Sequence, residues 1–140
     1  MGSRRKARVL AFQALFCLEA NPGAEDEILD FPWLDEEMRS RYEEDTLVFS
    51  RMLIAGTLEH RDEIDAKIES RLEHWDIHRL GKVDLAILRI SVYALLFQKE
   101  IPATVTIDEA VDIAKDYGSD ESYRFINGVL DGIHKSDHEE

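Results

Sequence analysis

A chain of 140 residues with 44% hydrophobic and 34% charged residues has the composition of a globular protein that buries one core, which excludes a disordered chain. Its formal net charge of -13 argues, taken alone, against a nucleic-acid partner, because phosphates are negative as well. No apolar run approaches the roughly 20 residues of a membrane span, and no signal-peptide stretch follows the first charges, so we expect a cytoplasmic protein.

The N-terminal part of the chain predicts two helices. Apolar residues recur at helical spacing over residues 3–20, and this run ends at the turn signal of residues 21–23. Pro32 is expected at the first position of the second helix, where its missing N–H costs nothing. That helix either continues to Ala55 or breaks near residue 45.

A third helix and a central helix are predicted next. Gly56 separates the second helix from a third one, whose narrow apolar stripe includes Ile64 and Ile68. After Gly81, residues 82–98 are apolar on nearly every side. A helix of that kind belongs at the centre of a domain.

Two more helices complete the predicted fold. Residues 106–109 match a capping box that opens a helix, and this helix is expected to end at Tyr117 with Gly118 as the residue that follows it. The last helix presents an inward face over residues 122–133. With no convincing strand, we predict one all-α domain over residues 1–140, with an N-terminal half of about 1–78 and a C-terminal half of about 79–136.

Motifs for enzymatic or metal chemistry are missing from the sequence. The glycines are scattered singly, and no nucleophile is ordered beside a base. The lone Cys17 has no cysteine partner and is interpreted as a small buried hydrophobe. His74 and His78 are four residues apart but lack a strong third ligand. We therefore expect no enzyme activity, no cofactor and no metal site.

Four cations occupy the beginning of the first predicted helix: Arg4, Arg5, Lys6 and Arg8. Cations at a helix N-terminus oppose the macrodipole at a typical cost of about 0.3 to 1 kcal/mol each. The other 132 residues carry 13 basic against 30 acidic residues, so the chain is a positive tip on an acidic body. This pattern indicates either an anionic partner, gripped by planar guanidinium groups, or a frayed solubilising terminus.

Two other residues stand out from the pattern of their helices. Arg89 lies inside the apolar central helix and needs a carboxylate partner, for which we propose Glu109 or another acid of the following helix. Phe125 lies near the beginning of the last helix, where an aromatic ring can stack an unpaired base. The alternative for Phe125 is an ordinary place in the core.

Four segments together resemble the family of the transcription antitermination factor NusB. The resemblance runs through the chain in order, and its last three segments are specific in combination. The segments are RRKAR at 4–8 followed by AFQAL at 11–15, RLGKVDLAILRISVY at 79–93, IDEAVDIAK at 107–115 and SYRFINGVL at 122–130.

The resemblance implies an all-α fold of two three-helix bundles. It also implies binding of single-stranded boxA RNA together with NusE, a ribosomal small-subunit protein, within an RNA polymerase antitermination complex that contains other Nus factors. By the same resemblance, RNA contacts are expected from Arg4, Arg5, Lys6, Arg8, Gln13 and Phe125. Asp84 and Glu121 match acidic positions at the partner surface, and residues 24–50 match nothing functional.

Other interpretations of the sequence stay open. A NusB-like domain also forms the N-terminal part of an RNA cytosine methyltransferase, which would require this chain to be a fragment. A helical module that docks its basic end on an acidic protein is the alternative from another class. The sequence does not distinguish a monomer from a homodimer, and a dimer that buried the first helix would mask the RNA site.

Overall fold

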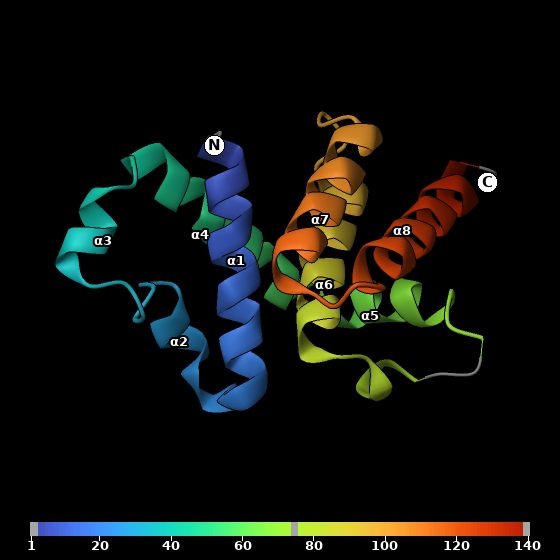
Figure 1. Cartoon of the computed structure of the whole chain (residues 1–140), viewed down its shortest axis with the longest axis horizontal. Helices are drawn as coiled ribbons and strands as arrows, with labels where there is room; N and C mark the ends of the chain where they lie inside the picture. Colours follow the sequence, from blue (N-terminus) through green and yellow to red (C-terminus); the bar gives the residue numbers. More distant parts are fainter. Residues whose placement is uncertain (1–2, 74–75, 139–140) are drawn as a thin grey trace.

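The computed structural model describes residues 3–73 and 76–138, which form helices and no strand (Figure 1). The predicted all-α fold is confirmed. None of the described helices is long and apolar enough to cross a membrane. The elements are α1 (Ser3–Ala20), α2 (Glu25–Ile28), α3 (Glu36–Ser40), α4 (Glu44–Glu59), α5 (Arg61–Glu69), α6 (Lys82–Phe97), α7 (Ala103–Tyr117) and α8 (Ser122–His138), with short 3-10 helices at Pro22–Ala24 and Ile77–Arg79.

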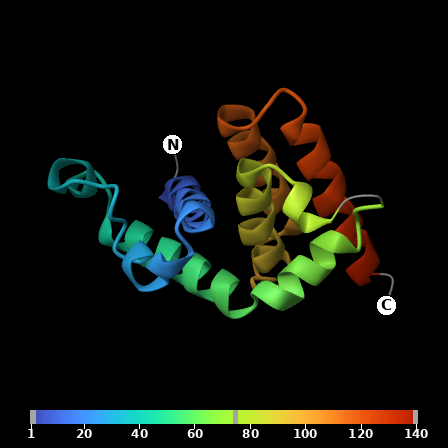
Figure 2. The same ribbon diagram turned by 90° about the horizontal axis from the view of Figure 1, so that it is seen from below.

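Helix α6 lies at the centre of the fold, as its apolar sequence predicts. It contacts α1, α4, α5, α7 and α8, and Figure 2 shows it between α1 on one side and α8 on the other. Its Ile87 and Leu88 are fully buried. Helices α1 and α4 pack together on α6, and α7 and α8 form a second group on it. The division near residues 78 and 79 stays a prediction.

The second predicted helix does not begin at Pro32. Helix α3 begins instead after Asp35, whose side chain accepts a hydrogen bond from the backbone N–H of Met38 at 2.8 Å. Phe31 has a positive φ of 52°, a left-handed turn that stops the chain from entering a helix there. Phe31 is fully buried, and the free energy gained by burying its ring offsets the strain of this backbone conformation. A true cap at Asp35 therefore outweighs the weaker signal of Pro32.

Gly56 does not end a helix, because it lies inside α4 and the helix continues to Glu59. A β-carbon at Gly56 would clash with the ring of Tyr93 on α6. The glycine therefore allows α4 to approach α6 closely. Its low helix propensity destabilises α4 slightly, and the closer packing of the two helices compensates for this.

Helix α7 begins earlier than the capping-box pattern predicts. Pro102 precedes it, and its carbonyl accepts hydrogen bonds from the N–H groups of Val105 and Thr106. Thr106 therefore lies within the helix, and Glu109 is available to bond elsewhere. At the other end, α7 ends at Tyr117 and is followed by Gly118, as predicted. Gly118 has φ -94° and ψ -172°, so its backbone is extended and not the left-handed conformation common after helices.

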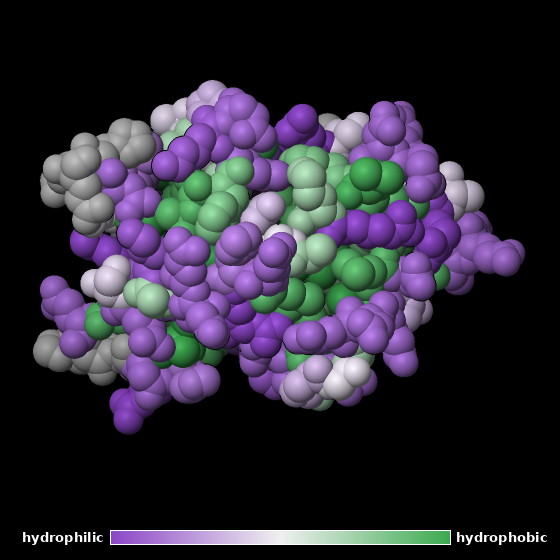
Figure 3. All heavy atoms as spheres, turned by 180° about the vertical axis from the view of Figure 1, so that it is seen from behind, coloured by the Kyte–Doolittle hydropathy of each residue, from purple (hydrophilic) through white to green (hydrophobic). Residues whose placement is uncertain are grey.

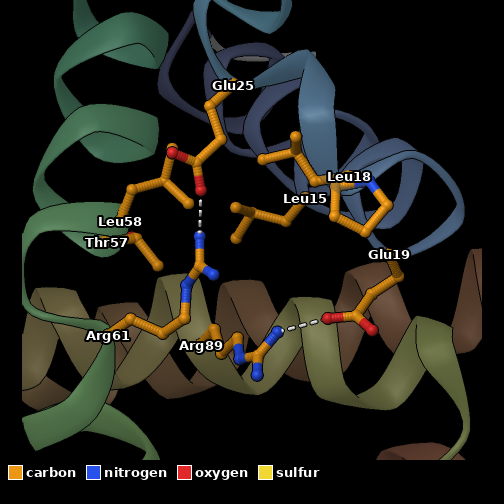
Figure 4. Close-up of a pocket in the computed structure, with 9 residues that line it drawn as sticks. Leu15, Leu18, Glu19, Glu25, Thr57, Leu58, Arg61 and Arg89 are labelled. Atoms are coloured by element: carbon orange, nitrogen blue, oxygen red, sulfur yellow. Dashed lines mark hydrogen bonds and ion pairs between the residues drawn. The ribbon is translucent and has the colours of Figure 1, made fainter.

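The partners of Arg89 differ from those expected. Its guanidinium bonds to both carboxylate oxygens of Asp65 on α5, each at 2.9 Å, and to Glu19 on α1 at 2.6 Å. Burial lowers the pKa of Arg89, but these hydrogen bonds more than offset it and the pKa is raised. The acids come from preceding helices rather than α7, so Arg89 ties α1, α5 and α6 together beside a cavity of about 160 Å³ (Figure 4).

Candidate nucleic-acid interface

The four predicted cations share the N-terminal end of α1 but differ in exposure. Arg4 is exposed, Arg5 and Lys6 are half-buried, and Arg8 is only 7% exposed. No acidic residue lies in the first turn of this helix. The tip therefore presents positive charge at the N-terminus of a helix, where the macrodipole also favours anions.

Arg5 reaches across to α7 and is already paired there. Its Nη2 lies 3.2 Å from Oε1 of Glu109 and 2.7 Å from a carboxylate oxygen of Asp112, and its Nε also donates to Glu109. The hydrogen bond to Glu109 is the main reason that the pKa of Arg5 is raised. An RNA phosphate would have to compete with these two carboxylates for Arg5.

Arg8 acts from beneath the surface. Its Nη1 lies 3.9 Å from Oε2 of Glu109, and burial lowers the pKa of its guanidinium. Its Nη2 and the hydroxyl of Thr106 are buried and make no hydrogen bond among the described residues. Both residues border a cavity of about 10 Å³ between α1, α4, α6 and α7. Arg8 therefore adds positive charge and joins helices more than it offers a surface contact.

An aromatic residue that the sequence reasoning missed lies beside Arg4. The Cζ atom of Arg4 is 4.6 Å from the centre of the Phe49 ring on α4, within the range of a cation–π contact. Phe49 belongs to the segment in which no family motif was matched. No sequence signal marks this contact, because the two residues are brought together only by the packing of α1 on α4.

A seam between α1 and α7 continues from the cationic end along both helices. Besides the Arg5–Glu109 pair, the rings of Phe12 and Tyr117 lie 5.1 Å apart across it. Phe16 and Tyr117 are exposed, at 40% and 45%. Exposed aromatic rings along this seam are surfaces on which bases can stack. The spacing of Phe12 and Phe16 on one helix was the available sequence signal for this row.

Gln13 lies on α1 but is engaged away from the α1/α7 seam. Its side-chain oxygen accepts a hydrogen bond from Nε1 of Trp33 at 3.2 Å. Trp33 belongs to the segment between α2 and α3. An RNA contact by Gln13 stays a prediction, and the bond to Trp33 gives the residue a structural role as well.

The remaining predicted site residues lie at the other end of the molecule. Phe125 is half-buried and packs against the core near the beginning of α8, and Glu121 is exposed just before that helix. Asp84 is half-buried in the first turn of α6. Figure 1 shows the beginnings of α6 and α8 at the lower end and the beginning of α1 at the upper end. The fold thus groups Asp84, Glu121 and Phe125 but separates them from the arginines.

No group of three or more His, Cys, Asp or Glu side chains that could hold a metal ion occurs within residues 3–73 and 76–138. His78 is exposed within the 3-10 helix that precedes α6. His74 lies outside the described residues. The expected absence of a metal site at this pair stays a prediction.

Comparison with known proteins agrees with the fold and with the motifs. The model of the NusB family matches residues 5–135. The transcription antitermination protein NusB of Treponema pallidum subsp. pallidum is 56% identical over 133 residues, covering 95% of this chain and 93% of that protein.

Two solved structures show the same architecture. T. maritima NusB has a TM-score of 0.84 at 41% identity, covering 94% of this chain and 90% of that one. A complex of the antitermination factors NusB and NusE with double-stranded RNA has a TM-score of 0.79 at 28% identity, covering 97% of this chain and 98% of that one. The chain belongs to the NusB family.

Proposed function

We propose that this protein is a transcription antitermination factor that binds single-stranded boxA-type RNA together with NusE, and that the cationic end of α1 makes the RNA contact. One observation carries the proposal: positive charge is concentrated at the beginning of α1 in a chain whose net charge is -13. Arg4 is exposed there, and Arg5 and Lys6 are half-buried. Such a distribution confines phosphate binding to one place.

The relatives support this function over the alternatives. They are antitermination proteins, of which the Treponema pallidum protein is matched along 93% of its length, and this favours the assignment over the N-terminal domain of an RNA methyltransferase. The solved complex of NusB and NusE also contains RNA, which is double-stranded in that structure. An RNA partner also explains a cationic helix start better than an acidic protein does, because the exposed aromatic rings along the α1/α7 seam suit unpaired bases.

The two ends of the molecule suggest a division of labour. The RNA enters at the cationic end and follows the α1/α7 seam toward Phe125, where a second base can stack. Asp84 and Glu121 lie at the end where α6 and α8 begin. A protein partner that contacts these acids would extend the RNA surface beyond the few cations that the chain supplies, and the complex would join the RNA polymerase assembly with other Nus factors.

An RNA-shift titration tests the proposal, using boxA RNA, a scrambled single strand and a duplex, each with and without NusE. We expect weak binding by this protein alone and tight binding of boxA RNA with NusE. The slope of log affinity against log salt should be shallow, about -2 to -3, because roughly 0.7 counterions are released per phosphate contact on a single strand. Equal affinity for boxA and scrambled RNA with NusE would contradict the specificity claim, and tighter duplex binding would contradict the single-stranded substrate.

A further inference from the structure

The ring of Phe49 on α4 lies against two arginines, Arg4 and Arg8, which are one helical turn apart on the same face of α1. The Cζ of Arg4 is 4.6 Å from the ring centre, and the Cζ of Arg8 is 6.0 Å from it. Phe49 is half-buried, Arg8 is buried and Arg4 is exposed. The ring therefore lies near the buried guanidinium of Arg8 and also beside the exposed guanidinium of Arg4 at the surface.

The contact fixes how Arg4 can meet a ligand. The Cζ atom of its guanidinium lies over the ring at 4.6 Å, while the side chain as a whole remains exposed to solvent. A guanidinium plane with an open face can stack an unpaired base, as an aromatic ring does. Holding the long side chain against Phe49 before binding also lowers the conformational entropy that is lost on binding.

A groove of about 420 Å³ adjoins the Arg4–Phe49 pair. Val48 and Met52, at 54% and 46% exposure, supply unusually open apolar walls. The carboxylates of Glu43 and Asp45 also border it, and they would repel a phosphate. The groove therefore suits the flat apolar faces of a base, with its phosphate left outside. Figure 3 shows apolar patches among hydrophilic atoms on the face along which α4 runs.

We propose that Phe49 is a positioning residue of the RNA site, which holds the Arg4 guanidinium as a platform on which one unpaired nucleobase stacks at the groove of Val48 and Met52. This inference rests on the RNA binding proposed above. It assigns a role to a residue of the 24–50 segment, which carries no family motif. Arg4 acts here through its planar shape as well as its charge.

A double-variant cycle tests the coupling of Phe49 to Arg4. RNA affinity in the presence of NusE is measured for the wild type, Phe49→Leu, Phe49→Tyr, Arg4→Ala and the combination of Arg4→Ala with Phe49→Leu. We expect Phe49→Leu to weaken RNA binding about fivefold, the size of a surface cation–π contact, and Phe49→Tyr to preserve it. In the Arg4→Ala background, Phe49→Leu should have no further effect. An equal loss in both backgrounds would show that Phe49 only supports the fold.

Arg4→Lys separates stacking from charge, because lysine keeps the charge without the planar face. It should bind RNA more weakly than the wild type but more tightly than Arg4→Ala, because only the stacking part of the contact is lost, whereas wild-type affinity would show a simple phosphate contact. A scan with one abasic site per RNA locates the base. One abasic position should weaken binding to the wild type about fivefold or more and leave binding to Arg4→Lys unchanged.

The outcomes of the scan and the cycle are distinguishable from failure of the proposed function. If no abasic position behaves in this way while the wild type still binds boxA RNA, the platform is wrong and the RNA function stands. If the wild type binds no RNA with NusE, the proposed function itself fails. Circular dichroism and NusE binding of each variant confirm that the fold is retained, and Phe49→Tyr provides a variant that keeps the ring if Phe49→Leu unfolds.

Discussion

Arg5 on α1 and Glu109 on α7 form a charged pair at the surface where RNA is expected, with Nη2 3.2 Å from Oε1. Asp112 joins the same guanidinium at 2.7 Å. The cation that the sequence marks for phosphate is therefore held by two carboxylates before any RNA arrives. RNA binding at this position is an exchange of one anion for another, so its net gain is smaller than a free arginine would give.

Replacing Asp112 should strengthen RNA binding. Asp112 is about half exposed and pairs with Arg5, so Asp112→Asn removes a competitor without disturbing the core. We expect the affinity for boxA RNA with NusE to rise about two- to fivefold, the worth of an exposed ion pair. Asp116→Asn, an equal charge change on the same helix, is the control. An equal rise in both variants would show a general charge effect rather than competition for Arg5.

The ties of Arg89 predict a stability effect away from the RNA surface. Asp65→Ala removes two of its hydrogen bonds. The Arg89 side chain, which is 11% exposed, then keeps only its pairing with Glu19. Because hydrogen bonds to charged groups contribute about 1.5–3 kcal/mol, we expect a loss of that size in the free energy of unfolding, measured in urea. Glu69→Ala, an exposed position on α5, should change it by about 0.5 kcal/mol or less. A similarly small loss for Asp65→Ala would refute this role of Arg89.

Phe125 can be tested for its two candidate roles with one substitution. Phe125→Leu keeps most of the apolar volume of a half-buried side chain, so the free energy of unfolding should fall by less than about 1.5 kcal/mol. A lost stacking contact should weaken boxA binding about fivefold or more. Unchanged RNA affinity, together with lower stability, would place Phe125 in the core alone.

Cys17 should react slowly with thiol reagents in the folded protein. Its side chain is half-buried against the core, in partial agreement with the buried hydrophobe expected from the sequence, and burial raises the pKa of the thiol. The folded state therefore favours the neutral thiol, so stability from this group is complete below the unfolded pKa and declines as pH rises beyond it. Alkylation with iodoacetamide at pH 8 should be severalfold slower in buffer than in urea, and equal rates would contradict the burial.

The sequence predicted the long helices well because their apolar spacing directly reflects the buried face, as in α1 and α6. It misplaced local boundaries where a tertiary contact outweighed a local signal. Gly56 is required by the ring of Tyr93 on another helix, and Glu109 bonds to Arg5 instead of a helix cap. The acids that hold Arg89 were likewise sought on the wrong helix, since helix order in space does not follow from helix periodicity.

The sequence predicts the candidate site as a list of residue types and says little about their arrangement. The charge anomaly of the first helix identified the cations, but nothing in one sequence reported that Arg8 is buried or that Arg4 lies over Phe49. Both facts depend on how α1 packs against α4 and α7. The separation of Phe125 from the arginines along the α1/α7 seam is a property of the fold in the same way.

The most direct test of the central claim is RNA binding by the double variant Arg4→Ala with Arg5→Ala, measured with NusE by fluorescence anisotropy on labelled boxA RNA. These two side chains are exposed and half-buried at the tip, so helicity and NusE binding should equal those of the wild type. We predict that specific boxA binding is abolished. Wild-type affinity for boxA RNA in this folded, NusE-binding variant would contradict the claim that the cationic end of α1 is the RNA site.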